Sequence, residues 1–190
     1  MPTIPISNFQ TAFLQKALQG PNLQLRRLTT ADAPELTTYA NNPKIAANLM
    51  DRFPSPYTLE NAHWFINYAA ESQAESVFAI DRGEGLIGVI SLIFKPDIYA
   101  ASAELGYWLG EPFWGQGIMP EAITLIVKHA FEDLQHSRVY ANVFHTNPAS
   151  KRVLEKAGFE REGIARKAVV KNGKLLDAWT FGKVNPSLLV

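Results

Sequence analysis

The sequence contains no cysteine, and its 18 basic side chains are balanced by 18 acidic ones, so the formal net charge is zero. Without cysteine, the chain can form no disulfide and no zinc–thiolate site, and it has no cysteine nucleophile. A balanced charge provides no general attraction to nucleic acid or to an anionic membrane, so we expect neither as a partner. The absence of cysteine agrees with a cytoplasmic location.

The sequence also lacks a long hydrophobic segment. The longest apolar run near its middle, residues 86–94, is interrupted by Gly88 and Ser91 and is much too short to span a bilayer. It predicts instead a central strand that is buried on both faces. The first residues have neither the charged start nor the apolar stretch of a signal peptide. With 190 residues, 47% of them hydrophobic and 19% charged, the chain is expected to form one soluble globular domain.

The order of the predicted elements is that of an α+β protein with a mixed sheet of six or seven strands. Apolar runs predict strands at residues 23–28, 76–82, 86–95, 101–109, 138–145, 160–168 and 177–184. Helical spacing and capping residues predict helices at residues 30–40, 43–49, 59–70, 120–134 and 148–157. We expect residues 23–190 to form this domain and residues 1–22 to form an N-terminal extension.

The extension has apolar residues at partial helical spacing and ends at Gly20-Pro21. These residues are Phe9, Phe13, Leu14 and Leu18. The pattern predicts a short helix that packs either on the domain or on a second copy of the chain. A homodimer is therefore one of the arrangements that we expect.

The most informative stretch is a glycine-rich turn, Gly115-Gln116-Gly117, between the strand expected at residues 101–109 and a helix. Backbone N–H groups at a helix start form an anion site, and glycines let a phosphate approach the main chain. Pro120 suits the first helical position, where its missing N–H costs nothing. The turn lacks both G-x-G-x-x-G and G-x-x-x-x-G-K-[ST], which excludes these two nucleotide-binding fingerprints. An ordinary connection between a strand and a core helix is the alternative.

A second informative stretch follows one strand later. Residues 138–145 alternate between apolar and polar side chains, as a strand does. They lead to a short helix that Asn147 can cap, with Pro148 at its first position and Gly158 just past its end. A capped helix between two strands needs no function to explain it.

Together, these stretches resemble the GCN5-related N-acetyltransferase superfamily, and within it the Rim type that acetylates ribosomal-protein N-termini. Three motifs occur in the expected order: Ala103-Glu104-Leu105-Gly106-Tyr107-Trp108-Leu109, then Trp114-Gly115-Gln116-Gly117-Ile118-Met119, then Asn147 to Ser150 with Lys156 to Phe159. The resemblance covers about residues 23–184. It departs from the superfamily's Q/R-x-x-G-x-G/A turn at Trp114, which replaces Gln or Arg, and at Met119, which replaces Gly or Ala.

The resemblance implies a sheet that parts near Trp108 and Val143 to admit the pantetheine arm of acetyl-coenzyme A (acetyl-CoA), the expected cosubstrate. It places the pyrophosphate on the main chain of the turn, at Gly115, Gln116, Gly117, Ile118 and Met119. It also places the thioester carbonyl on the N–H groups of Trp108, Leu109 and Gly110. These donors would lie beside a bulge in the strand and form an oxyanion-type site.

Acetyl transfer needs a base for the amine and a proton donor for the leaving thiolate. By resemblance, Glu104 is the base, acting through a water, Ser150 is the acid at the sulfur, and Asn147 holds the pantetheine arm. The alternatives are structural: a solvent-facing or cross-strand glutamate, a serine that satisfies a first-turn N–H, and an asparagine that is only an N-cap. His145, at the end of a strand beside the site, is the second candidate base. The four histidines lack metal-ligand spacing, so no metal is expected.

The Rim-type resemblance implies that the acceptor is the α-amine of a protein N-terminus. A free α-amine has a pKa of about 7.7 to 8.0, so a base of modest strength suffices near neutral pH. Two alternatives stay open. A small cationic amine, such as an antibiotic or a polyamine, would need acidic residues in the cleft, for which Asp51, Glu60 and Asp177 are candidates. A non-catalytic sensor that binds acetyl-CoA is favoured by Met119.

Overall fold

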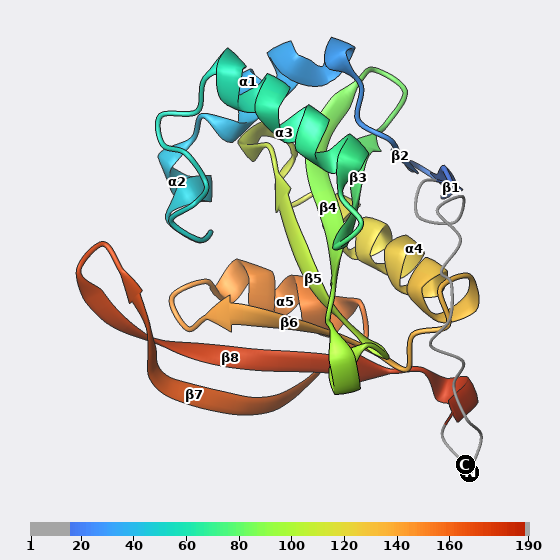
Figure 1. The fold of residues 1–190 in the computed structure, drawn as a ribbon. Coiled ribbons are helices and arrows are strands. Elements are labelled where there is room, and N and C mark those ends of the chain that lie inside the picture. Colours follow the sequence, from blue (N-terminus) through green and yellow to red (C-terminus); the bar gives the residue numbers. More distant parts are fainter. Residues whose placement is uncertain (1–15, 189–190) are drawn as a thin grey trace.

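The computed structural model describes residues 16–188, and its centre is one sheet of eight strands (Figure 1). The strands follow the order β1-β2-β3-β4-β5-β6-β8-β7, and every neighbouring pair is antiparallel except β5 and β6, which are parallel. The bounds are β1 (Leu18–Gln19), β2 (Gln24–Arg26), β3 (Glu75–Asp81), β4 (Leu86–Phe94), β5 (Ser102–Leu109), β6 (Arg138–Phe144), β7 (Glu160–Lys171) and β8 (Lys174–Val184). The mixed, mostly antiparallel α+β fold is confirmed, with one strand more than the six or seven expected.

The additional strand, β1, lies within residues 1–22, where the sequence predicts a helix. The Gly20 N–H donates to the Leu23 carbonyl at 2.8 Å, and this turn folds Leu18 back against Leu25 of β2. The helical prediction is therefore wrong at Leu18, because pairing with the sheet outweighs a weak helical spacing. The other residues of that predicted helix, Phe9, Phe13 and Leu14, lie outside the described residues. Within residues 16–188, no helix combines the length and the apolar character needed to cross a membrane.

Five α-helices are present in the described part of the chain. They are α1 (Ala33–Ala40), α2 (Pro43–Ala46), α3 (Leu59–Glu71), α4 (Ile118–Glu132) and α5 (Pro148–Lys156). Asn147 caps α5 as predicted, and Thr58 caps α3 in the same way, each by accepting a backbone N–H three residues further on. The helix α4 begins before Pro120, because Gly117 with a φ of 77° serves as its N-cap. Pro120 is thus the third residue of α4, still in the first turn, where N–H groups have no helical partner.

Helices cover both faces of the sheet, and the alternation of side chains separates two cores (Figure 1). On β3, Phe78 and Ile80 belong to the larger core with α4 and α5, whereas Val77 and Ala79 belong to the smaller core with α1 and α3. The strand β5 follows the same rule. Its odd-numbered residues face the larger core, and its even-numbered residues face the side of α1 and α3.

The sheet parts between β5 and β6. These strands pair only where Ser102–Glu104 lie opposite Arg138–Tyr140. Beyond this point β5 continues beside β4, while β6 continues beside β8, and Figure 1 shows the two halves of the sheet diverging. The predicted parting near Trp108 and Val143 is confirmed, because both residues lie beyond the last paired positions. Each strand keeps one partner, so the gap leaves unpaired only the sides of β5 and β6 that face each other.

Candidate active site

The glycine turn between β5 and α4 has a main chain that is open to a ligand. Gly115 and Gly117 have φ values of 76° and 77°, in the left-handed region that favours glycine, and a Cβ atom at either position would meet open space. The turn ends at the start of α4, whose first N–H groups have no partner within the helix and lie at its positive end. The open main chain and the helix end both suit the predicted pyrophosphate site.

A positively charged side chain that belongs to none of the predicted motifs lies beside this turn. Arg82, in the hairpin between β3 and β4, donates from Nη1 to Gln116 Oε1 at 3.3 Å, and Gln116 Nε2 donates to the Pro112 carbonyl at 3.0 Å. Gln116 therefore ties the turn to the hairpin, and the guanidinium adds positive charge near the predicted pyrophosphate site. Arg82 lies 34 residues before Gln116, so only the assembled sheet reveals its position.

Met119 occupies the position at which the superfamily's turn has Gly or Ala, and its side chain points into the protein. Met119 is only 6% exposed and belongs to the larger core, as does its neighbour Ile118 at 5%. Their N–H groups belong to the start of α4, while their side chains pack beneath it. Met119 therefore adds core packing and does not oppose an anion at the turn. This finding removes the feature that favoured a non-catalytic sensor.

Of the three main-chain donors predicted for the thioester carbonyl, the strand register favours Leu109. The Gly110 N–H donates to the Ile87 carbonyl at 2.9 Å. Because hydrogen-bonded and non-bonded pairs alternate in an antiparallel ladder, Trp108 also faces β4, and the Leu109 N–H is directed toward the gap. Trp114 Nε1 donates to the Leu109 carbonyl at 2.7 Å and holds this residue in place. The expected bulge is wrong, since β5 pairs with β4 in continuous register, and the parting from β6 is what exposes the donor.

Glu104 is the last residue of β5 that pairs with β6, so it lies where the gap begins. Its Oε2 accepts a hydrogen bond from Lys95 Nζ at 2.5 Å, and its Oε1 accepts one from Asn142 Nδ2 at 3.2 Å. Thr180 Oγ1 in turn donates to Asn142 Oδ1 at 3.0 Å. The carboxylate thus takes part in the cross-strand pairing that was its structural alternative, and these contacts fix its place at the mouth of the gap.

Ser150 reaches the gap from α5. Its Oγ lies 2.6 Å from the hydroxyl oxygen of Tyr107 on β5, and its N–H donates to Asn147 Oδ1 at 3.1 Å. Asn147 therefore serves as the N-cap, and its contact with a pantetheine arm stays a prediction. The Ser150 hydroxyl is therefore hydrogen-bonded to a residue outside its own helix, and no local motif indicates this partner.

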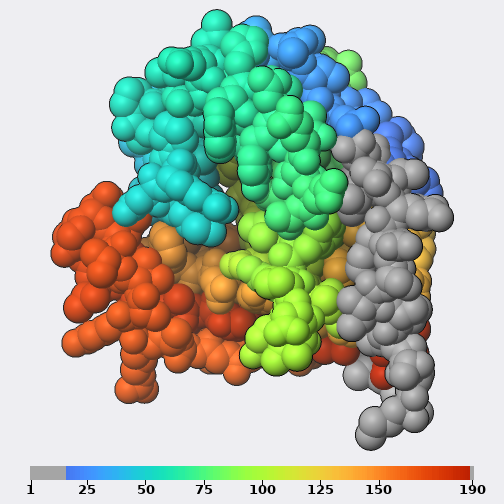
Figure 2. Space-filling view, viewed as in Figure 1, coloured from blue at the N-terminus to red at the C-terminus, as the bar shows by residue number. Residues whose placement is uncertain are grey.

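Glu104 and Ser150 approach the gap from opposite faces of the sheet. The even-numbered Glu104 lies on the face of α1 and α3, whereas the odd-numbered Tyr107, with Ser150 against it, lies on the face of α4 and α5. A group that passes through the gap can therefore meet Ser150 on one face and Glu104 on the other. Figure 2, viewed from the face of α1 and α3, shows a hollow between the loop after α2, the β4–β5 region and the β7–β8 hairpin.

Two contacts join the elements that surround this hollow. Phe53, in the loop after α2, packs against Trp108 of β5 with the ring centres 6.3 Å apart. Lys171, at the tip of the β7–β8 hairpin, donates from Nζ to the Leu49 carbonyl and to Asp51 Oδ1, both at 2.7 Å. This bridge joins the hairpin to the loop after α2.

The three acidic residues considered for a cationic acceptor already have roles in the fold. Asp51 is paired with Lys171, and Asp177 Oδ1 accepts the N–H of Lys167 at 2.9 Å. Glu60 lies in the first turn of α3, where its charge favours the helix dipole. Two of the three candidates therefore have partners within the protein, and the third supports a helix end.

His145, the second candidate base, connects two strands. Its ring Nδ1 accepts the backbone N–H of Asp177 at 3.1 Å, and its backbone N–H donates to the Asp177 carbonyl at 3.0 Å. One ring nitrogen is therefore occupied by the backbone of β8. Among the residues described, no group of three or more His, Asp or Glu side chains is arranged to hold a metal ion.

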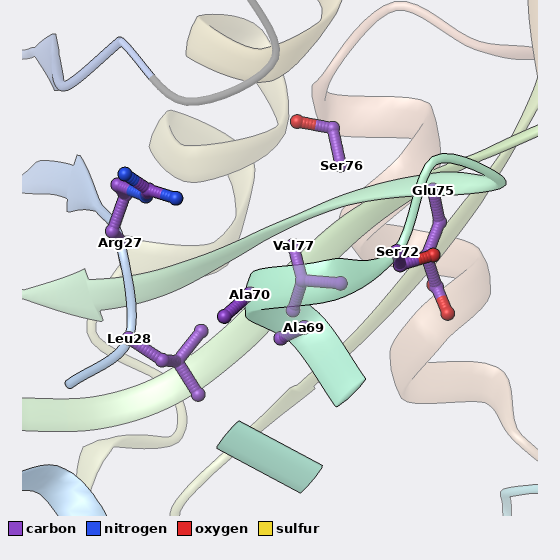
Figure 3. A pocket seen from close by; sticks show the side chains of 8 residues that line it. All are labelled: Arg27, Leu28, Ala69, Ala70, Ser72, Glu75, Ser76 and Val77. Atoms are coloured by element: carbon purple, nitrogen blue, oxygen red, sulfur yellow. The ribbon is translucent and has the colours of Figure 1, made fainter. Parts of the chain in front are cut away.

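A separate pocket lies where the end of α3 meets the start of β3 (Figure 3). Its lining consists of Arg27, Leu28, Ala69, Ala70, Ser72, Glu75, Ser76 and Val77. It contains none of the residues that the sequence predicts for the site, so we assign it no part in the chemistry.

Comparison with known proteins places these features in a family. The model of a family described as acetyltransferase (GNAT) domain matches residues 22–160. The chain is 36% identical over 176 residues to "Probable N-acetyltransferase YjcK" of Bacillus subtilis, covering 89% of this chain and 97% of that one. It is 31% identical over 108 residues to the ribosomal-protein-serine acetyltransferase of Escherichia coli, covering 57% and 60% of the two chains. A solved ribosomal L7/L12 alpha-N-protein acetyltransferase, in complex with coenzyme A, shares the fold with a TM-score of 0.80 at 22% identity, covering 89% and 98%.

Proposed function

Because the chain belongs to the GNAT family of acetyl-CoA-dependent N-acetyltransferases, we propose that its acceptor is the α-amine of a protein N-terminus. The observation that carries the reaction is the gap between β5 and β6, with Glu104 on one face and Ser150 on the other. The similarity to a ribosomal-protein-serine acetyltransferase supports this choice of acceptor.

The residues at the gap divide the chemistry between the two faces. Glu104 takes a proton from the amine through a water, and the Leu109 N–H donates to the thioester oxygen as that oxygen becomes negative. A C–N bond forms and the C–S bond breaks, while Ser150 donates a proton to the departing sulfur. The amine thus loses one proton and the sulfur gains one. The amides from Gly115 to Met119 bind the pyrophosphate, with Arg82 adding positive charge.

Lys95 weakens the attraction of Glu104 for a charged acceptor amine. Burial lowers the pKa of its ammonium, but the hydrogen bond and charge of Glu104 outweigh burial and raise this pKa above its usual value. Lys95 is therefore charged near neutral pH and offsets the charge of Glu104, so the pair provides no net negative charge to attract a second cation. An α-amine with a pKa of about 7.7 to 8.0 is partly neutral there, whereas an alkyl amine with a pKa of about 10.4 is almost fully charged. This difference supports an N-terminus over a polyamine.

We expect the purified protein to acetylate a short peptide that has a free N-terminus. Two other acceptors should show a kcat/KM about a hundredfold lower, because a smaller fraction of their amines is neutral. One is the same peptide with a blocked N-terminus and one lysine, and the other is spermidine. Mass spectrometry of the products and release of free thiol measure both. Faster acetylation of spermidine than of the free peptide would favour the small-amine alternative and contradict this proposal.

Replacing Gly117 with valine is expected to raise the apparent KM for acetyl-CoA. A β-branched residue resists a φ of 77°, and its side chain would occupy the open space at the predicted pyrophosphate site. Gly173, in the turn between β7 and β8, has a φ of 72° and equally open surroundings. Gly173→Val is therefore a control matched for backbone strain, which costs about 1–3 kcal/mol at such positions.

Calorimetric titration with acetyl-CoA and thermal unfolding of both valine variants separate binding from stability. Equal acetyl-CoA affinities in the two variants would mean that the pyrophosphate does not bind at the glycine turn. If the unmodified protein binds no acetyl-CoA, the proposed function itself is wrong.

A further inference from the structure

Tyr107 is a polar side chain at the gap that the chemistry described above does not use. It lies on the face of β5 toward α4 and α5, and its ring packs against the larger core. Its hydroxyl oxygen is 2.6 Å from Ser150 Oγ. Burial raises the pKa of Tyr107 to about 12, and the hydrogen bond with Ser150 offsets only part of this rise. The phenol therefore keeps its proton near neutral pH.

The direction of this hydrogen bond decides what Ser150 can do. A serine hydroxyl has one proton to donate and can also accept, and its proton rotates to suit its partners. If Ser150 donated to Tyr107, that proton would be occupied. If Tyr107 donates, the Ser150 O–H is free to turn toward the gap, while Asn147 Oδ1 holds the Ser150 N–H at 3.1 Å. A protonated phenol is a better donor than an aliphatic hydroxyl, which favours the second arrangement.

We propose that Tyr107 is a positioning residue whose O–H donates to Ser150 Oγ and so directs the Ser150 O–H at the sulfur of the leaving thiol. This role rests on the proposed function of Ser150 as the proton donor. As the C–S bond breaks, its electron pair goes to sulfur and the Ser150 proton moves toward it. The Tyr107 hydrogen bond then stabilises the negative charge that builds on the serine oxygen. The serine oxygen then regains a proton from water and Glu104 returns the amine's proton to water, so the overall transfer balances without a further reactant.

The variant Tyr107→Phe keeps the ring in the core and removes only the hydroxyl. We expect kcat with acetyl-CoA to fall by about tenfold or more, with KM for acetyl-CoA unchanged, because Tyr107 lies outside the glycine turn. The double variant with Ser150→Ala should be no slower than Ser150→Ala alone, since the two hydroxyls act as one unit. Tyr99→Phe removes a hydroxyl from a tyrosine that is 66% exposed, and this matched control should keep the wild-type kcat.

Changing the leaving group separates positioning from a general structural defect. An aromatic thiol leaves more readily than the thiol of coenzyme A and needs less proton donation. The loss of kcat/KM caused by Tyr107→Phe should therefore shrink when S-phenyl thioacetate, the acetyl thioester of thiophenol, is the acetyl donor. Equal losses with both donors, or additive losses in the double variant, would overturn the proposal.

The outcomes also distinguish this inference from the proposed function. Full activity of Tyr107→Phe beside a slow Ser150→Ala would overturn the role of Tyr107 and leave the proposed function intact. A fully active Ser150→Ala would show that Ser150 is not the proton donor, and the role of Tyr107 would fail with it. If the unmodified protein transfers no acetyl group to any amine tested, the proposed function fails.

Discussion

Replacing Ser150 with alanine is expected to lower kcat for acetyl transfer by about ten- to a thousand-fold, near the usual scale for a positioned acid–base group. The substitution removes the hydroxyl that reaches from α5 to Tyr107, so the sulfur loses its proton donor. Asn147 can still accept the N–H of residue 150, so the cap of α5 is kept. The free energy of unfolding should therefore change by only about 1–3 kcal/mol, the cost of leaving the Tyr107 hydroxyl without this partner. Steady-state kinetics with a peptide acceptor and thermal unfolding measure the two effects.

Ser137→Ala is the matched control for this variant. Ser137 Oγ donates to the Ala101 carbonyl at 3.0 Å, just before β5 and β6 pair. Its removal deletes a hydrogen bond of a similar kind without touching the gap, so kcat should stay at the wild-type value. If Ser150→Ala proves as active as Ser137→Ala, Ser150 is not the proton donor.

Replacing Glu104 with glutamine is expected to lower kcat by about a hundredfold or more on the acidic side of the pH profile. Below the pKa of the acceptor α-amine, about 7.7 to 8.0, the amine carries a proton that the base has to remove. Above that pH the amine is neutral, so the loss should shrink. Glutamine keeps the length of the side chain and an oxygen that can accept from Lys95, so the fold and the affinity for acetyl-CoA should be preserved. A pH–rate profile with a peptide acceptor measures the effect.

Glu162→Gln is the control for the loss of an ion-paired carboxylate. Glu162 lies on β7 and pairs with Arg138 of β6, so its replacement leaves the proposed base in place. We expect its pH profile to follow that of the wild type. A loss in Glu104→Gln that is the same at every pH would mean that Glu104 orients the acceptor or the sheet and does not take the proton.

Elements with a strong local pattern were predicted to within a residue or two. The strand β4 occupies Leu86–Phe94 where residues 86–95 were expected, and α3 occupies Leu59–Glu71 where residues 59–70 were expected. The strand β1 was missed because two residues are too few to form a pattern and because its pairing depends on the turn that begins at Gly20. The gap between β5 and β6 was expected only through the family resemblance, since alternation along a strand does not say where a neighbour leaves it.

The sequence by itself determined the glycine turn, the cap at Asn147 and which residues of β5 share a face. Steric limits on φ, capping bonds and the two-residue period of a strand all act over a few neighbouring residues. Only the tertiary structure decided that Lys95 pairs with Glu104 and that Tyr107 meets Ser150, 43 residues further along the chain. The second contact joins two elements of the fold, and its geometry depends on where β5 leaves β6 and where α5 packs. No local pattern carries that information, because it arises from the packing of the whole sheet.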